Sequence, residues 1–465
     1  MSLYSAGFVD VKMWLGVLKD EPESIEAPNI IPVESLDAFE INESMFDVLP
    51  SLYIALGDHG TWANIRLLRA GDPISVVITP RLRQDETEEP TDVKPLVKAE
   101  YTIQTVTKTL TDEMNYAIIK MFCVYNAQSY LNQIVTYPAD TIENKILYTK
   151  KQSAEVMQEM LDGTSIGFTS EVKTDDSSYW LNCNETRAKF IERIVEHAWI
   201  KEDDAPISYV DRNGIMHLNS IENMINGRPP IFDCAFTKSV LEKTEDDQSK
   251  ISTVIISDAL HLNAAQPILN QGGYKLSYSL YNPYNKKELN KYDFPKYGTG
   301  GGAAAALADA AGQLTGAFGG SKLKDPEDGF RTSQYERKKP FLASLPNKRT
   351  NGIISDNIDG GMHFKELHMH YTIAPKHNET MRRSFFQNFV KFTVDTTRQG
   401  AFFGVKDYMF ELGRTVNCCF DLAERPDALH SGKYVVCKLK YRYQLKQPFM
   451  IEAVVVNDGY YDLGA

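Results

Sequence analysis

Three histidines, His363, His368 and His370, form the densest group of metal-ligating side chains in the sequence. If this segment is a strand, His368, His370 and Glu366 project from the same face. A stable zinc site needs further ligands, and no neighbouring cysteine or aspartate completes a convincing set. The pattern therefore favours structural histidines at an interface and predicts no metal site. An ion held by histidines at the axis of an oligomer is the alternative.

A glycine-rich segment is the second candidate, because Gly298, Gly300 and Ala303 formally match a dinucleotide-binding fingerprint. That fingerprint works only between a buried strand and the helix that follows it. The preceding residues, Lys291–Tyr297, do not have the pattern of a buried strand, and the GK[ST] of a phosphate-binding loop is absent. The segment Gly298–Gly320 is therefore typical of a Gly/Ala-rich linker, and we predict no cofactor.

The motifs of serine hydrolases, G-x-S-x-G and S-x-x-K, are absent from the sequence. Adjacent carboxylates occur at Asp175-Asp176 and Asp203-Asp204, in polar turns where such charges are usually solvated. Neighbouring turn residues also do not define the cleft of a glycosidase. The sequence therefore predicts no catalytic residues and no enzyme activity.

A basic stripe, Lys438, Lys440 and Arg442, lies on one face of a predicted strand. The whole chain carries a net charge of −12 and has a pI near 5.4. In such a protein the stripe is expected to pair with acidic neighbours rather than to grip phosphates. The acidic balance suits a surface past which nucleic acid slides without specific binding.

The length of 465 residues predicts two to four domains. No run approaches the ~18 apolar residues of a membrane span, and the N-terminus has no signal-peptide pattern. We therefore expect no membrane span and a chain made and kept in a cytoplasm. The cysteines are scattered without a C-x-x-C pair, which predicts free buried thiols. They are Cys123, Cys183, Cys234, Cys418, Cys419 and Cys437.

The elements that would position side chains are clearest between Asn182 and Leu218. Asn182 is the expected N-cap of a helix, with Glu185 completing a capping box. Two short strands follow Pro206 and are predicted to form a hairpin with a tight turn at Asp211-Arg212-Asn213-Gly214. The apolar stripe of the helix is predicted at Phe190, Ile191, Ile194, Val195 and Ala198, with Arg187, Glu192, Arg193 and Glu196 facing away.

Short strands with turns between them are predicted on both sides of this stretch, which indicates small antiparallel barrels or sandwiches. A helix is predicted at Ser153–Leu161, with Ser153 as its cap. The predicted strands are Leu52–Leu56, Ile74–Ile78, Tyr101–Leu110, Tyr116–Tyr125, Ile231–Lys238, Lys250–Ser257, Tyr274–Tyr281, Lys365–Tyr371, Phe389–Val394 and Val405–Leu412, followed by a hairpin within Leu429–Val456.

Three short motifs, taken in order, carry a resemblance to a known family. The first is Glu43-Ser44, followed by a strand and an Asp-x-Gly turn. The second is the polar opening Asn184-Glu185-Thr186, which leads into a helix and then a hairpin with Asp-x-x-Gly. The third is Ser431-Gly432-Lys433-Tyr434 before the last hairpin. In this order the chain resembles the tail-hub proteins of bacteriophages, a family shared with the hub half of type VI secretion spikes.

The resemblance implies a mainly β (α+β) fold with two tube-like antiparallel β-barrel domains. The first barrel would span residues 1–150, and the small central α/β module, a helix followed by a hairpin, would span 151–229. The second barrel would combine 230–289 and 351–465. Residues 290–350 would be a flexible Gly/Ala-rich insertion, where the chain departs from the family pattern.

The function implied by the resemblance is that of a structural baseplate or tail hub in a phage virion, assembled in the host cytoplasm. Three copies would form a homotrimeric ring that joins the tail tube to a central spike or cell-puncturing protein, beside other baseplate proteins, and lets the genome pass. A peripheral baseplate or receptor-binding protein is the alternative. A metal-binding β-barrel enzyme is a further alternative that the residues favour less.

Overall fold

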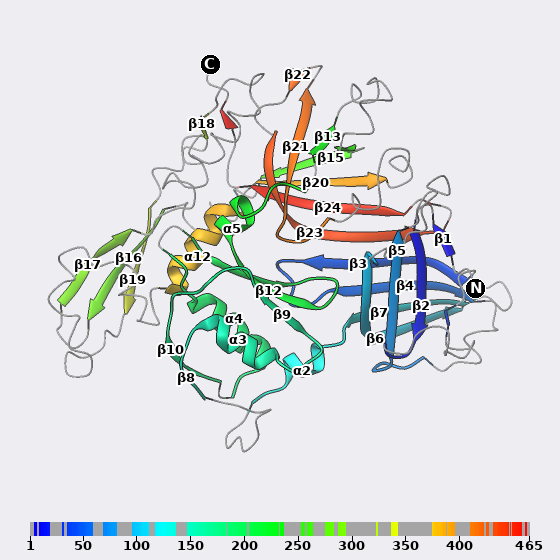
Figure 1. Cartoon of the computed structure of the whole chain (residues 1–465), viewed down its shortest axis with the longest axis horizontal. Helices are drawn as coiled ribbons and strands as arrows, with labels where there is room; N and C mark the ends of the chain where they lie inside the picture. The colour runs from blue at the N-terminus through cyan, green and yellow to red at the C-terminus, as the bar shows by residue number, and fades with distance from the viewer. Residues whose placement is uncertain are drawn as a thin grey trace.

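The fold is described from a computed structural model of the whole chain (Figure 1). The model describes residues 4–6, 9–18, 30–31, 35–58, 68–80, 95–110, 117–135, 147–182, 184–201, 204–231, 233–236, 253–255, 258–263, 275–282, 287–293, 322–323, 336–342, 374–386, 388–395, 410–422, 425–426, 431–445, 447, 449–457 and 461–462.

One large sheet runs through both ends of the chain, and its N-terminal half has the strand order β1-β2-β5-β6-β7-β4-β3. All neighbours in this half pair antiparallel. Alternating residues of β7 are buried, as the predicted two-residue periodicity requires. The strands are β1 (Tyr4–Ala6), β2 (Val9–Leu15), β3 (Leu36–Ser44), β4 (Ser51–Asp58), β5 (Pro73–Pro80), β6 (Val97–Leu110) and β7 (Ala117–Tyr125).

The sheet continues from β3 into the C-terminal half through a direct pairing with β23. From β23 one path leads through β21 and β13 to β14, and the other leads through β24 and β20 to β15. Figure 1 shows β3, β4, β23 and β24 lying roughly along one axis across the molecule, and neighbours among them are antiparallel. The strands are β13 (Asp233–Phe236), β14 (Thr253–Ile255), β15 (Asp258–Asn263), β20 (Asn388–Asp395), β21 (Thr415–Leu422), β22 (Arg425–Pro426), β23 (Gly432–Gln444) and β24 (Met450–Asn457).

The middle of the chain folds as a small α/β module. The predicted hairpin is confirmed: β11 (Pro206–Val210) and β12 (Ile215–Ser220) pair antiparallel, and β9 (Gly167–Ser170) adds to β12 in parallel. A second pair joins β8 and β10. The other elements of the module are α2 (Gln128–Asn132), β8 (Leu147–Lys151), α3 (Ser153–Leu161), β10 (Ser178–Leu181), α4 (Arg187–His197) and α5 (Ile221–Asn226).

The two predicted helices are present, but the residues that cap them differ from the prediction. Helix α4 is capped by Thr186, whose side chain accepts from the backbone N–H of Lys189, and not by Asn182. Asn184 precedes this cap with a positive φ of 59°, a conformation that asparagine tolerates better than most residues. Helix α3 is capped by Gln152 in a capping box with Glu155.

Burial in the helices confirms most of the predicted faces. In α3 the buried residues include Val156, Met157, Met160 and Leu161, and in α4 they include Phe190, Ile191, Ile194 and Val195. Arg187 was predicted to face away, which is wrong, because it is buried and its guanidinium donates to the side chain of Gln133. A charged side chain tolerates burial when such partners are present.

The predicted solvation of the paired carboxylates is wrong for Asp176 and Asp204, which are both buried. Asp176 accepts from the backbone N–H and the hydroxyl of Ser153 at 2.7 and 2.8 Å, and from the N–H of Trp199 at 2.9 Å. Asp204 accepts from the N–H groups of Ala205 and Glu222. Both carboxylates satisfy backbone donors where chain segments meet, a role that the residue pattern does not reveal.

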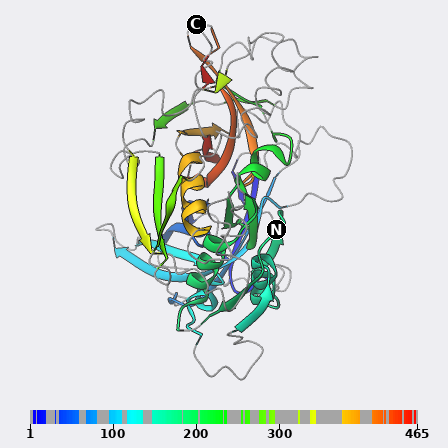
Figure 2. The ribbon, with the colours of Figure 1, turned by 90° about the vertical axis from the view of Figure 1, so that its left-hand side faces the viewer.

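The remaining elements include α12 (Ala374–Phe385), which the sequence analysis missed, as it missed the short helices α2 and α5. A small sheet has the order β17-β16-β19. Figures 1 and 2 both show α12 between this small sheet and the middle module. The remaining strands are β16 (Lys275–Asn282), β17 (Lys287–Asp293), β19 (Glu336–Leu342) and the short pair β18 (Lys322–Leu323) and β25 (Tyr461–Asp462).

The predicted mainly β (α+β) class is confirmed, although the described strands do not close into a barrel. Four cysteines, Cys123, Cys234, Cys418 and Cys437, are free and buried, as predicted. The predicted strand Lys365–Tyr371 and the segment Gly298–Gly320 lie outside the described residues. The domain limits stay predictions.

Removing the carboxylate of Asp176 should destabilise the middle module, because it leaves buried donors of Ser153 and Trp199 without an acceptor. For Asp176→Ala we expect a loss of about 3 kcal/mol in the free energy of unfolding, measured by chemical denaturation. The exposed neighbour provides the matched control, and Asp175→Ala should change it by less than about 0.5 kcal/mol. Equal effects of the two substitutions would contradict the assignment.

Candidate functional site

The most unusual group of polar residues in the described part of the chain is a buried junction around Arg212, at the tip of the β11–β12 hairpin. Its guanidinium Nη1 donates to Glu43 Oε1 at 2.8 Å, and its backbone N–H donates to Glu43 Oε2 at 2.7 Å. Nε donates to the carbonyl of Leu96 at 2.6 Å. Nη1 also lies 2.8 Å from the Phe410 carbonyl and 2.7 Å from the Tyr441 hydroxyl. We call these five residues the central junction.

The central junction brings together segments that are far apart in the sequence. Glu43 lies in β3 and Leu96 directly before β6, both in the N-terminal half of the large sheet. Phe410 precedes β21, and Tyr441 lies in β23, both in the C-terminal half. The single side chain of Arg212 therefore connects all three parts of the chain.

Burial dominates the electrostatics of the central junction, since the Arg212 and Glu43 side chains are only 4% and 0% exposed. Burial raises the pKa of Glu43 above its ordinary value, and the charge and hydrogen bonds of Arg212 oppose that rise. Burial acts to lower the pKa of Arg212, but Tyr441 and Glu43 outweigh it and raise this pKa. The guanidinium therefore remains charged in the core and needs every acceptor around it.

Hydrogen bonds and a glycine in the turn orient Arg212 toward these acceptors. Asp211 Oδ1 accepts from the N–H groups of Asn213 and Ile215, both at 2.9 Å, which fixes the turn. Gly214 adopts a φ of +76°, and a Cβ there would collide with the hydroxyl of Tyr125. The glycine is thus needed both for the turn and for the close approach to the N-terminal half.

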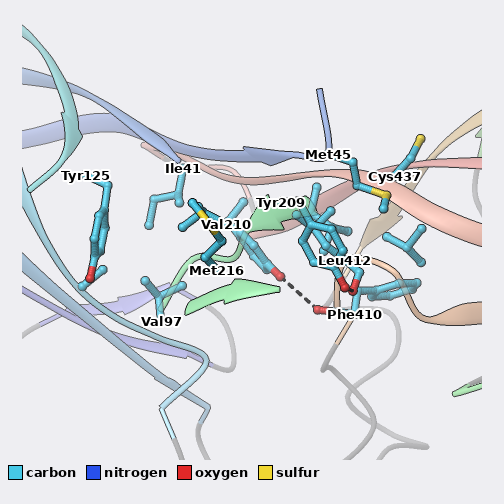
Figure 3. Close-up of a cluster of buried hydrophobic side chains, with 14 of the residues drawn as sticks. Ile41, Met45, Val97, Tyr125, Tyr209, Val210, Met216, Phe410, Leu412 and Cys437 are labelled. Carbon is cyan, nitrogen blue, oxygen red and sulfur yellow. Dashed lines mark hydrogen bonds between the residues drawn. The ribbon is translucent and has the colours of Figure 1, made fainter. Parts of the chain in front are cut away.

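The hairpin also contacts the C-terminal half through Tyr209, whose hydroxyl donates to the carbonyl of Leu412 at 3.1 Å. Gly413, with a φ of +74°, leaves room for this tyrosine. Figure 3 shows the contact within an apolar cluster that includes Ile41, Val97 and Met216. The polar central junction is therefore enclosed by packed side chains from both halves.

Helix α12 makes a second connection between the C-terminal half and the middle module. The side-chain amide of Asn378 donates to the carbonyls of Glu196 and Ala198, both at 2.8 Å, at the C-terminal end of α4. His377 lies against Trp199 with ring centroids 5.0 Å apart. These contacts provide hydrogen-bond donors at a helix end, where the last carbonyls have no donor within the helix.

A charged histidine stands beside the turn. His217 Nδ1 lies 3.2 Å from Glu171 Oε1, and its Nε2 lies 3.2 Å from Asp211 Oδ2. Both ring nitrogens face carboxylates, so both must donate, which requires the imidazolium form. Burial acts to lower the pKa of His217, but the hydrogen bonds and charges of Asp211 and Glu171 outweigh burial and raise the pKa to about 9.

The histidine cluster and the glycine-rich segment that the sequence analysis considered are not part of this junction. His363, Glu366, His368 and His370 lie outside the described residues, as do Gly298, Gly300 and Ala303. Within the described part of the chain, no group of three or more His, Cys, Asp or Glu side chains is arranged to hold a metal ion. In the same residues no helix is long and apolar enough to cross a membrane.

The basic stripe pairs with an acidic neighbour on β3, as predicted. Lys440 Nζ lies 3.3 Å and Arg442 Nε 3.5 Å from the carboxylate of Glu40. Lys438 lies over the ring of Phe46, 5.3 Å from its centroid. The side chains of the basic stripe on β23 therefore interact with residues on and next to β3.

Sequence reasoning missed the central junction because each of its residues has an ordinary local explanation. Arg212 occupies a turn position, where a charged residue is usually solvated, and Glu43 lies outside the strands that the sequence analysis predicted. One available signal was the alternation of β3 from Phe39 to Glu43, which makes a charged residue at a buried position conspicuous.

Comparisons with known proteins complete the description. No protein-family model matches the sequence, and no curated protein is detectably similar to it. Among solved structures, the tail protein from Neisseria meningitidis MC58 aligns with a TM-score of 0.53 and 10% identity over 98% of both chains. The 43 kDa tail protein of prophage MuSo2 from Shewanella oneidensis aligns with a TM-score of 0.55 and 9% identity over 98% of this chain and 100% of the other.

A chain of a Francisella PdpA–VgrG complex also aligns, with a TM-score of 0.47 and 7% identity over 98% of this chain and 53% of its own length. This likeness is too weak to support a functional conclusion. The two tail proteins share the fold over 98% of this chain, so the chain has the fold of these two tail proteins.

Removing the charge of Arg212 should destabilise the protein strongly, because Glu43 and two carbonyls would stay buried without their donor. For Arg212→Met we expect a loss of about 3–5 kcal/mol in the free energy of unfolding, measured by denaturant titration. The double variant Arg212→Met/Glu43→Gln should recover part of this loss, since it no longer buries an unpaired carboxylate.

Arg442→Met is the matched control for this experiment, because Arg442 is half exposed in its pair with Glu40. Exposed ion pairs contribute little, so this variant should lose less than about 1 kcal/mol. Similar losses of unfolding free energy for Arg212→Met and Arg442→Met would show that the central junction stabilises the protein no more than an exposed ion pair does.

The charged state of His217 makes stability depend on pH. Its folded pKa of about 9 exceeds the usual 6.5, so its stabilising contribution is complete below pH 6.5 and is lost as the pH rises through 9. The wild type should therefore lose up to about 3 kcal/mol of unfolding free energy between pH 6.5 and 9. His217→Gln should flatten this decline, and an unchanged slope would contradict the assignment.

Proposed function

We propose that this chain is the structural hub of a phage tail or baseplate. The observation that carries the proposal is its likeness, over 98% of its length, to two tail proteins, one of them from a prophage. In this role three copies form a ring that joins the tail tube to a central spike or cell-puncturing protein. The ring also contacts other baseplate proteins and leaves a central passage for the genome.

The way in which the parts of the chain are joined supports a role as a rigid connector. A continuous sheet crosses from the N-terminal to the C-terminal half through β3 and β23, and the central junction fixes the middle module between them. Hydrogen bonds along a sheet and a buried ion pair both resist displacement of one part relative to another. A connector between tube and spike needs this resistance.

The charge of the chain is compatible with a passage for DNA. The net charge is −12, and the basic residues Lys440 and Arg442 on the sheet surface pair with Glu40. Phosphates would therefore find few free cations on this part of the sheet. We propose that DNA passes the ring without specific binding, and that the hub resides in the virion tail after assembly in the host cytoplasm.

A peripheral baseplate or receptor-binding protein is the second candidate. A fold shared with two tail proteins does not specify where in a particle the chain lies. The two roles differ in location, since a hub lies on the particle axis and a peripheral protein at its rim. We propose that the chain is not an enzyme, which agrees with a candidate site whose buried groups are all engaged in holding chain segments together.

Negative-stain imaging of the purified chain, alone and with its spike partner, tests the proposal. We expect threefold rings with a central hole, because the hub role requires a closed trimer around the genome path. Labelling the chain in assembled particles should place it on the tail axis. Single particles of one chain under both conditions would overturn the hub role, and label at the rim would favour the peripheral candidate.

A further inference from the structure

Two buried cysteines lie opposite each other on neighbouring strands of the C-terminal half. Cys234 is in β13 and Cys418 is in β21, and the parallel pairing of these strands makes the two cysteines direct register partners. Both carry thiols, and the two residues are 0% and 1% exposed. Register partners on adjacent strands project from the same face of a sheet. The pairing therefore brings together two oxidisable groups that are far apart in the sequence.

The face that carries both cysteines belongs to the core. In β21 Cys418 is buried, whereas its neighbour Asn417 is partly exposed, and Cys234 is part of the same hydrophobic core cluster as Cys418. The adjacent Cys419 has Ala235 as its register partner. Of the two consecutive cysteines in β21, Cys418 is thus the one aligned with Cys234.

The strand on the other side of β21 leaves room beside this pair. The register partner of Cys418 in β23 is Gly432, which has no side chain. On the far side of β13, the partner of Cys234 in β14 is Val254. The only side chain directly opposite Cys418 in either neighbouring strand is therefore that of Cys234.

The spacing of the strands suits a covalent bridge. Neighbouring strands lie about 4.8 Å apart, and the Cα atoms of a disulfide lie about 4.4–6.8 Å apart. The Cβ atoms of a disulfide are closer, at about 3.8 Å, so β13 must approach β21 by about 1 Å. This movement is open to β13 because it pairs with β21 over only four residues and with β14 over only three.

We propose that Cys234 and Cys418 are a redox pair, which joins β13 to β21 by a disulfide when the reduced protein meets a small-molecule disulfide such as oxidised glutathione. A cytoplasm keeps thiols reduced, so the bond forms outside it. For a tail protein this means after the particle leaves the host. That timing rests on the proposed function, whereas the pairing of the two cysteines does not.

The bond forms by thiol–disulfide exchange in two steps. The thiolate of one cysteine attacks a sulfur of the small disulfide, whose S–S bond breaks and releases one small thiolate. The thiolate of the second cysteine then attacks the protein sulfur of the mixed disulfide, which forms the Cys234–Cys418 bond and releases the second small thiolate. The two electrons and two protons that the cysteines lose convert the oxidant into two thiols.

The oxidant reaches the buried thiols from the end of the sheet. Within the described residues, β14 is the last strand on this path and pairs only with β13. Short terminal strands open more readily than the centre of a sheet. Opening of β13 and β14 exposes both cysteines while the N-terminal half stays folded, and closing then places the mixed disulfide beside the second thiol.

The bond would anchor the long segment between β13 and β21. That segment carries β15, β20, the small sheet β17-β16-β19 and helix α12. Joining its two ends removes conformations from the unfolded chain, and the effect grows with the length of the closed loop. The linked protein is therefore more stable than the reduced protein.

Incubation of the full chain with oxidised glutathione under native conditions tests the pair. When the protein is then unfolded and alkylated, it should have lost two of its six thiols, and peptide mapping should find Cys234 joined to Cys418. The melting temperature should rise by about 5 °C relative to the chain kept in reduced glutathione, because the closed loop restricts the unfolded chain.

Two variants separate this pair from the other cysteines. Cys234→Ala should keep all of its remaining thiols through the same incubation and should show no rise in melting temperature. Cys123→Ala is the matched control, because Cys123 is equally buried but lies in β7 of the N-terminal half. This variant should form the link as the unmodified chain does.

Six intact thiols after the incubation, or glutathione adducts without a link, would overturn the proposal. A bond between Cys418 and Cys419 would also overturn it, as would a link that forms only after denaturant has unfolded the chain. Each of these results leaves the hub role standing, because that role is decided by the oligomeric state and the position of the chain in the particle. Conversely, a chain that links Cys234 to Cys418 but forms no ring would overturn the hub role alone.

Discussion

The buried charge of Arg212 is the constraint on which the arrangement of the three parts depends. A guanidinium in the core is tolerated only when acceptors surround it, and here they come from β3, β23 and two loop carbonyls. Neither half of the sheet supplies the whole set. The hairpin that carries Arg212 is therefore stable in its position only when both halves are in place, which couples their packing to the middle module.

The continuous sheet and the central junction restrict different movements of the two halves relative to each other. Pairing between β3 and β23 fixes the register along the strands, because a shift by one residue would turn the buried Tyr441 and Tyr443 outward. Arg212 and Tyr209 hold the hairpin against both halves from one side of that pairing. Asn378 adds a further attachment on α4. Together they leave little freedom for one half to tilt against the other.

The sequence was sufficient for elements whose signal is local. The turn at Asp211–Gly214, the apolar stripe of α4 and the alternation of β23 follow from residue types at short spacing, and the structure confirms them. The burial of Asp176, Asp204 and Arg187 could not be predicted from the sequence, because a polar residue in a turn or at a helix start shows nothing of the distant group that buries it. Helix α12 was missed since its polar composition resembles a loop, and its contacts with the middle module through Asn378 and His377 join segments far apart in the sequence.

A ring built from such chains places a particular demand on the joint between the halves. In a closed ring every angular error at a joint is repeated around the circumference, so a small tilt at each step leaves a gap or a spiral in place of a closed circle. The joint within the chain can be fixed by burial during folding, as the full burial of Tyr441 and Glu43 shows. In the proposed ring, the contacts between copies would then need only to find an edge whose direction is already set.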